Sequence, residues 1–471
     1  TDGVDNRQPS VAPLSTADCT ILLSNPSLQV IIHCMVHWSR VVFATLLSIY
    51  DDSSPRSNEN ETFKAELQPL QNRRNNNNNI HIMPGEQKKQ KLMTGEEKKC
   101  DSAPGIAAKI ARKNILELQP YRCARDDYSE GVLLDANENA FGPTSLPSKN
   151  LDPYDNSNAL ERYPDPYQIA LKELYAKYRG HGLTPANIFV GVGSDEAIDM
   201  LMRIFCQPAR DEILITPPTY GMYKVCAKVN DVSINSVPLT EDFDLRIPEM
   251  LAAVSEKTKL LFICSPGNPT CKAIPLAEIE KVASATSQYQ GLVVVDEAYV
   301  DFSDQGTAIE LIQKYPNIVV LQTLSKAFGL AGIRCGFCLG PPDVIQLMNN
   351  VKAPYNVNSL TSEVAMNAMG SIATLEKNIA GILEQRSLVA KQLEALDFVE
   401  KVYPSDANFL LFRVQQKAND LYKTMADAGV VTRFRGNEIH CDECIRVTIG
   451  TAEENAKFLE LLQKTWKDLT A

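Results

Sequence analysis

Lys326 lies just after a strongly apolar run of residues, Ile318–Leu321, and has small side chains on both sides of it. A lysine that is partly withdrawn from water has a lowered pKa, and its amine can form a Schiff base with an aldehyde. Arg334 follows in a glycine-rich segment, and a guanidinium suits the binding of a phosphate group. Thr323 and Ser325 add hydroxyl donors. Taken alone, Lys326 would also be consistent with an ordinary lysine on the solvent-exposed surface.

Asp296 closes a second apolar run, Leu292–Val295. An ionised carboxylate at that place is unfavourable unless it meets a cation. A protonated pyridine nitrogen is such a cation, and a carboxylate partner keeps it protonated. The alternative is an aspartate that only caps the following turn. Tyr299 comes three residues later and can direct its phenol at the same ring.

Asn268 lies in Ser265-Pro-Gly-Asn-Pro-Thr270, which also follows an apolar run. Two prolines make the turn rigid and hold the Asn268 amide in a fixed place. An amide there can bond a phenolate oxygen. By itself the segment would be read as a turn and nothing more.

A fourth motif combines glycines with the start of a helix. Residues 191–193 read Gly-Val-Gly, and Ser194, Asp195 and Glu196 then open the predicted helix. Free N–H groups at a helix start bind phosphate, although the glycine spacing is not a full dinucleotide fingerprint. Tyr220 follows two prolines and can stack on a flat ring. An aldehyde, a pyridinium, a phenolate and a phosphate are united in pyridoxal 5′-phosphate, which fits all four motifs.

The elements that position these motifs are predicted to form an α/β sheet. Short runs rich in Ile, Val and Leu without polar alternation are typical of parallel strands that are covered on both faces. Helix-period segments lie between them, at 196–205 and 276–284. In such a doubly wound sheet, ligands bind beyond the carboxyl ends of the strands. The predicted strands are 188–191, 212–216, 260–264, 292–296 and 318–323.

Composition and charge restrict the class of protein. The chain has 471 residues, 44% of them hydrophobic and 22% charged, which suits a folded protein of about two to four domains. A net charge of −11 disfavours nucleic acid or an anionic membrane as a partner. Twelve cysteines are too few for a disulfide scaffold. Two CxxC pairs, Cys335/Cys338 and Cys441/Cys444, are too far apart for an ordinary zinc ribbon. We therefore expect no metal, and ordinary thiols.

Residues 1–105 differ from the rest of the chain. An apolar stretch at 28–50 contains Arg40 near its middle, which is costly in a bilayer, so no membrane anchor is expected. A polar run and the tract Asn75–Asn79 follow. Such a segment buries too little apolar area to offset the entropy of ordering it. We expect a disordered extension or a misassigned start here.

Residues 110–470 resemble the aspartate-aminotransferase-like enzymes of fold type I, which use pyridoxal 5′-phosphate, and are most similar to the fungal histidinol-phosphate aminotransferase family. The resemblance implies a large, doubly wound, mostly parallel sheet domain at 155–345, a smaller α/β C-terminal domain at 346–471, and an N-terminal arm at 106–154 that packs with the small domain. The matching motifs are Leu118–Arg125, Leu134–Asn139, Arg162–Asp165, Gly191–Glu196, Arg433–Asn437 and Cys444–Thr451.

The resemblance also implies roles for individual residues. Lys326 carries the cofactor, Asp296 pairs with the pyridine nitrogen, and Tyr299 and Asn268 hold the ring oxygen. Tyr163 reaches the cofactor phosphate of a neighbouring subunit, which implies a homodimer with shared active sites. The remaining cofactor contacts implied are Ser194, Asp195, Glu196, Tyr220, Thr323, Ser325 and Arg334, and the implied substrate contacts are Tyr121, Asn137, Arg433 and Arg446.

The implied reaction moves an amino group between glutamate and histidinol phosphate in histidine biosynthesis, in the cytoplasm unless the N-terminal extension targets an organelle. An aromatic amino-acid aminotransferase, a threonine-phosphate decarboxylase and a non-catalytic regulator are the alternatives.

The sequence departs from the family pattern at one visible position: Cys271 stands where the family usually has glycine after Asn-Pro-Thr. If the backbone there needs a positive φ, the cysteine strains the turn.

Overall fold

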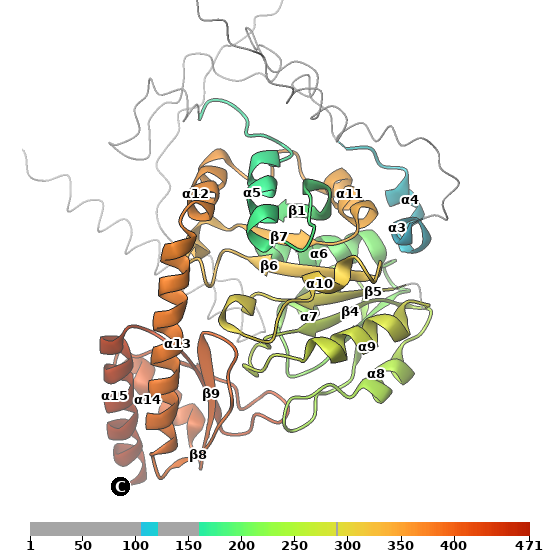
Figure 1. Ribbon diagram of the computed structural model, residues 1–471. Helices are drawn as coiled ribbons and strands as arrows, with labels where there is room; N and C mark the ends of the chain where they lie inside the picture. The colour runs from blue at the N-terminus through green and yellow to red at the C-terminus, as the bar shows by residue number, and fades with distance from the viewer. Residues whose placement is uncertain (1–104, 121–159, 289–290) are drawn as a thin grey trace, which may run out of the picture. The chain divides into compact units, whose positions relative to one another are not determined.

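The computed structural model describes residues 105–120, 160–288 and 291–471. Its central element is a seven-stranded sheet of order β1-β7-β6-β5-β4-β2-β3 (Figure 1). Strand β7 is antiparallel to both of its neighbours, and the pairs β6/β5, β5/β4, β4/β2 and β2/β3 are parallel. The strands are β1 (Ile188–Gly191), β2 (Glu212–Ile215), β3 (Ser233–Ser236), β4 (Thr258–Cys264), β5 (Leu292–Asp296), β6 (Ile318–Thr323) and β7 (Gly336–Leu339).

The mostly parallel sheet predicted from the sequence is confirmed, and its five predicted strands correspond to β1, β2, β4, β5 and β6. Two strands were not predicted. Strand β3 is polar, Ser-Ile-Asn-Ser, and lies at the edge of the sheet, so it lacks the apolar run of a buried strand. Strand β7 begins in the glycine-rich segment after Arg334, which reads as a loop.

Helices cover both faces of this sheet, which explains why its strands are apolar throughout. Val293 and Val295 of β5 belong to the core on one face, and Leu292 and Val294 belong to the core on the other. The first face is covered by α5 (Ile169–Arg179), α8 (Ile247–Ala253), α9 (Leu276–Thr286) and α10 (Ile309–Ile312). The second face is covered by α3 (Ile106–Ile110), α4 (Lys113–Leu116), α6 (Gly193–Phe205), α7 (Met222–Val229) and α11 (Pro342–Val351).

The two helices predicted in this region are also confirmed. Helix α6 includes the predicted 196–205 but begins earlier, at Gly193, and α9 extends the predicted 276–284 to Thr286. Three short 3₁₀ helices complete the region: η3 (Pro185–Asn187), η4 (Val300–Phe302) and η5 (Ala331–Ile333).

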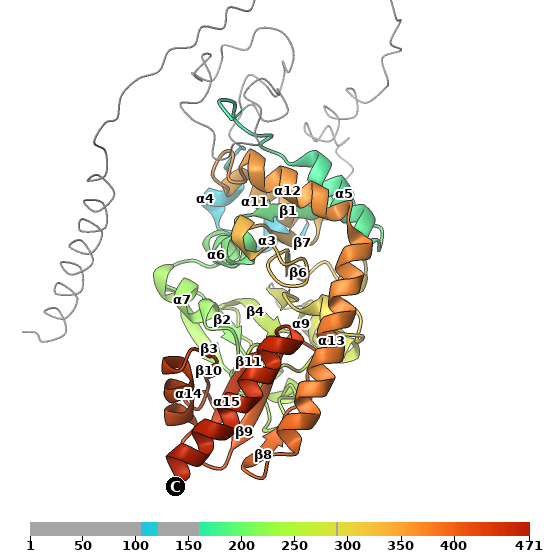
Figure 2. The same cartoon turned by 90° about the vertical axis from the view of Figure 1, so that its left-hand side faces the viewer.

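The C-terminal part of the chain forms a second sheet, four-stranded and antiparallel, of order β10-β11-β9-β8. Helix α13 passes along η4 of the first region and along β8 and β9 of this one, and α14 and α15 lie beside one another (Figure 2). The elements are α12 (Ser359–Met369), α13 (Ile372–Glu394), β8 (Val399–Val402), β9 (Phe409–Val414), α14 (Ala418–Asp427), β10 (Arg433–Phe434), β11 (Cys444–Thr448) and α15 (Ala452–Thr470).

Several expectations fall on residues that the structure does not describe. The N-terminal extension, with its apolar stretch at 28–50, lies outside the described residues, as does most of the arm at 121–154. The described piece of the arm, α3 and α4, packs against α11. The proposed domain limits stay a prediction. Within the described ranges no helix is both long and apolar enough to cross a membrane.

Candidate active site

The predicted site residues gather where the parallel strands of the large sheet end. Asp296 is the last residue of β5 and is paired in register with Cys264, the last residue of β4. Asn268 follows β4 by four residues, and Lys326 follows the end of β6 by three. Because parallel strands bring their carboxyl ends to one edge, these side chains meet although they are far apart in sequence.

A polar cluster lies at this edge between α6 and β7. The Tyr220 hydroxyl donates to Oδ1 of Asp195 at 3.0 Å, and Nη2 of Arg334 donates to Oδ2 of the same carboxylate at 3.3 Å. Nη1 of Arg334 lies 3.5 Å from Oγ of Ser325, whose hydroxyl is 2.9 Å from that of Thr323. Arg334 remains 46% exposed in its side chain, so its guanidinium is accessible to an anion.

Glycines allow the backbone to close tightly around this cluster. A Cβ on Gly336 would lie 2.2 Å from the amide nitrogen of Ser194, and a Cβ on Gly193 would lie 2.7 Å from Nη2 of Arg334. Gly193 also has φ +75°, a conformation that other residues rarely adopt. The first turn of α6 therefore packs closely against the Arg334 guanidinium, and we call this helix start together with Arg334 the cup; a helix start and a guanidinium both favour an anion.

Asp296 is a buried carboxylate, with 3% of its surface exposed. The Tyr223 hydroxyl donates to its Oδ2 at 2.6 Å, and the Ala298 N–H donates to its Oδ1 at 3.2 Å. Burial raises the pKa of Asp296 to about 6, while the bonds from Tyr223 and Ala298 oppose that rise. Among the described side chains no cation is bonded to it, so the carboxylate is placed for a cationic group of a ligand.

Lys326 lies beside this carboxylate, half-buried, with its Nζ 5.5 Å from the ring centroid of Tyr299. Burial lowers the pKa of Lys326, and the positive charge of Arg446 lowers it further. Asp195 and Asp296 act in the opposite sense. An amine with a lowered pKa is more often in the neutral form, which is the form that acts as a nucleophile or a base.

The small sheet brings two arginines to the same place. Nη1 of Arg446, on β11, donates to Oδ1 of Asn268 at 2.5 Å, so the Asn268 amide is left to present its N–H₂ group as a donor. Arg433 on β10 pairs in register with Arg446. The Arg446 guanidinium also lies 5.2 Å from the ring centroid of Phe409, which packs edge-on against Tyr299. Two adjacent guanidiniums can bind a carboxylate or a phosphate.

Of three further predicted residues, one makes contacts away from this arrangement and two lie outside the described residues. Glu196 accepts a bond from the Val192 N–H at 2.5 Å and one from the Asn356 amide at 3.1 Å, so its carboxylate closes the start of α6. Its role at the cofactor stays a prediction. Tyr121 and Asn137 lie outside the described residues.

Tyr163 lies on the surface of the described chain. It is 52% exposed and stacks on Tyr355, with ring centroids 4.5 Å apart and planes inclined by 18°. Its expected contact with a neighbouring subunit stays a prediction.

Tyr223 is the contact that the sequence analysis missed. It is fully buried and packs edge-on against Tyr220, with ring centroids 5.7 Å apart. The spacing of the two tyrosines is the sequence signal that could have identified it. Tyr220 and Tyr223 are three residues apart, on either side of the start of α7, and Tyr220 bonds to Asp195 while Tyr223 bonds to Asp296.

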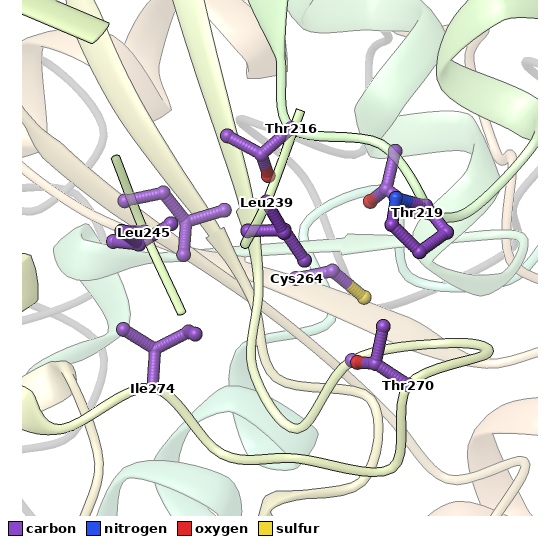
Figure 3. A pocket seen from close by; sticks show the side chains of 10 residues that line it. Thr216, Thr219, Leu239, Leu245, Cys264, Thr270 and Ile274 are labelled. Carbon is purple, nitrogen blue, oxygen red and sulfur yellow. The ribbon is translucent and has the colours of Figure 1, made fainter. Parts of the chain in front are cut away.

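A small cavity lies next to Cys264 (Figure 3). Its volume is about 10 Å³, about the space of one water molecule. Thr216, Thr219 and Thr270 line it, and the buried Thr219 hydroxyl has no hydrogen-bond partner among the described residues. This cavity is too small for a cofactor, and neither α6 nor Arg334 contributes to its lining.

The strain expected at Cys271 is present: its φ is +66° and its side chain is completely buried. Burial raises the pKa of its thiol to about 12, which leaves it protonated at neutral pH. Within the described ranges no group of three or more His, Cys, Asp or Glu side chains is arranged to hold a metal ion.

The comparisons with known proteins show the family of the chain. The family model described as aminotransferase class I and II matches residues 129–462, and the chain belongs to this class. The histidinol-phosphate aminotransferase of Candida maltosa is 45% identical over 384 residues, 76% of this chain and 98% of the relative. That of Schizosaccharomyces pombe is 46% identical over 375 residues, 75% of this chain and 95% of the relative. Within its class the chain belongs to the histidinol-phosphate aminotransferase family.

Solved structures show the same fold. The histidinol-phosphate aminotransferase of Clostridium acetobutylicum has a TM-score of 0.61 at 23% identity, and the match covers 66% of this chain and 92% of that one. A Thermus thermophilus aspartate aminotransferase mutant has a TM-score of 0.55 at 22% identity, and the match covers 64% of this chain and 88% of that one. The fold is therefore that of the aspartate-aminotransferase-like enzymes of fold type I, as predicted.

The cofactor of the family is pyridoxal 5′-phosphate, and the residues of this chain fit it. The buried Asp296 has no cation hydrogen-bonded to it among the described side chains, the Lys326 amine has a lowered pKa, and the cup at the start of α6 combines a helix start with a guanidinium. These are complementary to a pyridinium nitrogen, an aldehyde and a phosphate, respectively.

Proposed function

We propose that this chain transfers an amino group between the glutamate/2-oxoglutarate pair and the L-histidinol phosphate/imidazole acetol phosphate pair, as a step of L-histidine biosynthesis. The observation that carries the proposal is the pairing of Arg433 with Arg446 next to Asn268, in a chain of this family. The two amino donors end in a carboxylate and a phosphate, and a guanidinium pairs with either in a bidentate manner.

Each catalytic group has a defined task in this proposal. When bound, pyridoxal 5′-phosphate supplies an aldehyde that captures amines and a ring that accepts electrons as the Cα proton leaves. Asp296 keeps the proton on the ring nitrogen. The Lys326 amine, with its lowered pKa, holds the cofactor at rest and then removes the Cα proton of the amino donor.

The other residues orient the ring. The Asn268 amide and the Tyr299 hydroxyl would donate to the ring oxygen, and Tyr220 would stack on the ring face. Its hydroxyl bond to Asp195 holds it in position. The phosphate is bound by the first N–H groups of α6, at Ser194 and Asp195, and by side chains from the β6–β7 connection, which are Thr323, Ser325 and Arg334.

The function is tested by turnover of imidazole acetol phosphate with glutamate as the amino donor. We expect kcat/KM for L-histidinol phosphate to exceed that for phenylalanine, and we expect no carbon dioxide from threonine phosphate. A preference for phenylalanine would identify an aromatic amino-acid aminotransferase, and decarboxylation would identify the other alternative. Lys326→Ala should abolish both turnover and the visible absorption of lysine-bound cofactor, and an active variant would refute its assignment.

We also propose a homodimer with shared sites, in which Tyr163 of the partner subunit completes the phosphate site. The exposed Tyr163 supports this, as do the exposed apolar residues Leu360 and Val364 on one side of α12. Mixing inactive Lys326→Ala subunits with Tyr163→Ala subunits tests it, because each mixed dimer would contain one site with both residues intact. We expect partial recovery of activity on mixing, and no recovery would exclude sharing. The cytoplasmic location stays a prediction.

A further inference from the structure

The proposed reaction uses neither of the two CxxC pairs, and the structure places them in different geometries. Cys338 lies in β7 and Cys335 directly precedes that strand, and three residues of extended chain span about 10 Å. Cys335 belongs to the core on one face of the large sheet, and Cys338 belongs to the core on the other. A disulfide requires Cα atoms within about 7 Å of each other and Cβ atoms that face one another. This pair cannot be joined in the folded chain.

The second pair lies in a tight turn. The N–H of Cys444 donates to the carbonyl of Cys441 at 2.9 Å, which closes a four-residue turn. Such a turn holds its end Cα atoms within about 7 Å, the range that a disulfide requires. Both thiols are reduced, completely buried, and part of the same core. Asp442 between them is exposed, so the turn itself reaches the surface of the protein.

The surroundings of the turn favour reaction at Cys444. A hydrogen bond between the two thiols lowers the pKa of Cys444 and raises that of Cys441, and bonds from Arg413 and Tyr403 lower the pKa of Cys444 further. Burial opposes the change at Cys444. At Cys335, burial alone raises the pKa to about 12. The thiolate is the nucleophilic form, so Cys444 is the activated thiol of the four.

We propose that Cys441 and Cys444 form a peroxide-sensitive dithiol that closes to a reversible intramolecular disulfide. The Cys444 sulfur attacks one oxygen of hydrogen peroxide, the O–O bond breaks, and Cys444 becomes a sulfenic acid as one water leaves. The Cys441 sulfur then attacks the Cys444 sulfur, and the hydroxyl leaves as a second water. Two thiols are thus oxidised and one peroxide is reduced to two waters. A dithiol reductant reverses the change.

The modification would lie in the hairpin that carries the paired arginines. The carbonyl of Cys444 accepts the N–H of Arg435 at 2.8 Å, and Arg446 is two residues further along β11. The proposal depends on the geometry of this turn and not on the proposed reaction, so either could fail without the other.

Trypsin provides an internal comparison in the unmodified sequence. Cleavage after Arg435 and Arg446 releases both thiols of the turn in the peptide 436–446, and cleavage after Arg334 and Lys352 releases the other pair in the peptide 335–352. The full-length holoenzyme is treated with one equivalent of hydrogen peroxide, its remaining thiols are alkylated, and the digest is analysed by mass spectrometry. We expect peptide 436–446 to lack alkyl groups and to weigh two hydrogens less, with reversal by dithiothreitol, while peptide 335–352 is alkylated twice.

Two results would overturn the proposal. One is alkylation of both thiols of 436–446 at peroxide doses that oxidise other cysteines, and the other is equal oxidation of both pairs. A variant tests the order of events: in Cys441→Ser, Cys444 should stop at the sulfenic acid and be trapped by dimedone. Absence of that adduct, with Cys444 still alkylated, would contradict its role as the attacking thiol.

Discussion

Tyr223 offers the sharpest test of the electrostatics of the site. Its hydroxyl donates to Oδ2 of Asp296 at 2.6 Å, and both side chains are buried. In Tyr223→Phe the ring remains and only this donor is lost. A buried hydrogen bond to a charged group contributes about 1.5–3 kcal/mol. Because the bond stabilises the ionised form, its loss should raise the pKa of Asp296 by about 1–2 units from an already elevated value near 6.

The raised pKa should weaken the binding of the cofactor. A protonated Asp296 cannot pair with a pyridinium, and a pKa raised from about 6 to about 7–8 lowers the ionised fraction at pH 7 by about 2- to 10-fold, so the variant should bind pyridoxal 5′-phosphate more weakly by about that factor near neutral pH. The sign of the pH effect is defined: a higher pKa leaves more of the carboxylate protonated at pH 6 than at pH 8, so the loss should be larger at pH 6. The assay is a spectroscopic titration of apoenzyme with cofactor at a series of pH values.

Tyr175→Phe is the matched control. Tyr175 is also fully buried, and its hydroxyl donates to Oε1 of Gln322 at 2.6 Å, away from Asp296. The Tyr175 hydroxyl also accepts a bond from Nε of Arg179 at 3.1 Å, and the variant loses both bonds without touching the Asp296 carboxylate. The reasoning is refuted if Tyr223→Phe binds cofactor as the unmodified protein does, or if Tyr175→Phe weakens binding equally with no dependence on pH.

Three further predictions concern the cup, a strained turn and a buried carboxylate. Arg334→Ala should weaken binding of pyridoxal 5′-phosphate about 10- to 100-fold but leave pyridoxal, which has no phosphate, unaffected; equal losses in direct titrations would contradict the phosphate contact. Cys271→Gly should be more stable than Cys271→Ala by about 1 kcal/mol in urea unfolding, because φ is +66° there, and the reverse order would exclude strain. Burial raises the pKa of Glu297 to about 7 from 4.5, so the folded protein binds this proton more tightly than the unfolded chain does. Protonation therefore increases the free energy of unfolding. This contribution is complete below about pH 4.5 and is lost as the pH rises through 7. Unfolding measurements on Glu297→Gln should lack about 3 kcal/mol of that change, and unaltered pH dependence would show that this carboxylate does not titrate there.

The sequence predicted strands wherever burial on both faces left an uninterrupted apolar run, as at Leu292–Asp296. The sequence did not predict strands whose position depends on tertiary pairing rather than on an apolar run. The polar edge strand β3 is held by its pairing with β2, and β7 fills the gap between β1 and β6 although it starts at a glycine. Tyr223 was missed for a related reason, since a tyrosine in an amphipathic helix gives no sign of which buried acid it will meet.

The types of residue at the strand ends determined the chemistry before any fold was known. A lysine, an aspartate, an asparagine and an arginine after apolar runs define one ligand, because each group is costly there without its complement. Only the tertiary structure decided how they meet. Parallel strand pairing brings Asp296 beside Cys264, and antiparallel pairing places Arg433 opposite Arg446. The two CxxC pairs have the same spacing in sequence, but only Cys441 and Cys444 lie in a tight turn, which is why we propose that this pair alone is reactive. Distances between side chains depend on which backbones are paired, and short-range sequence patterns do not specify that pairing.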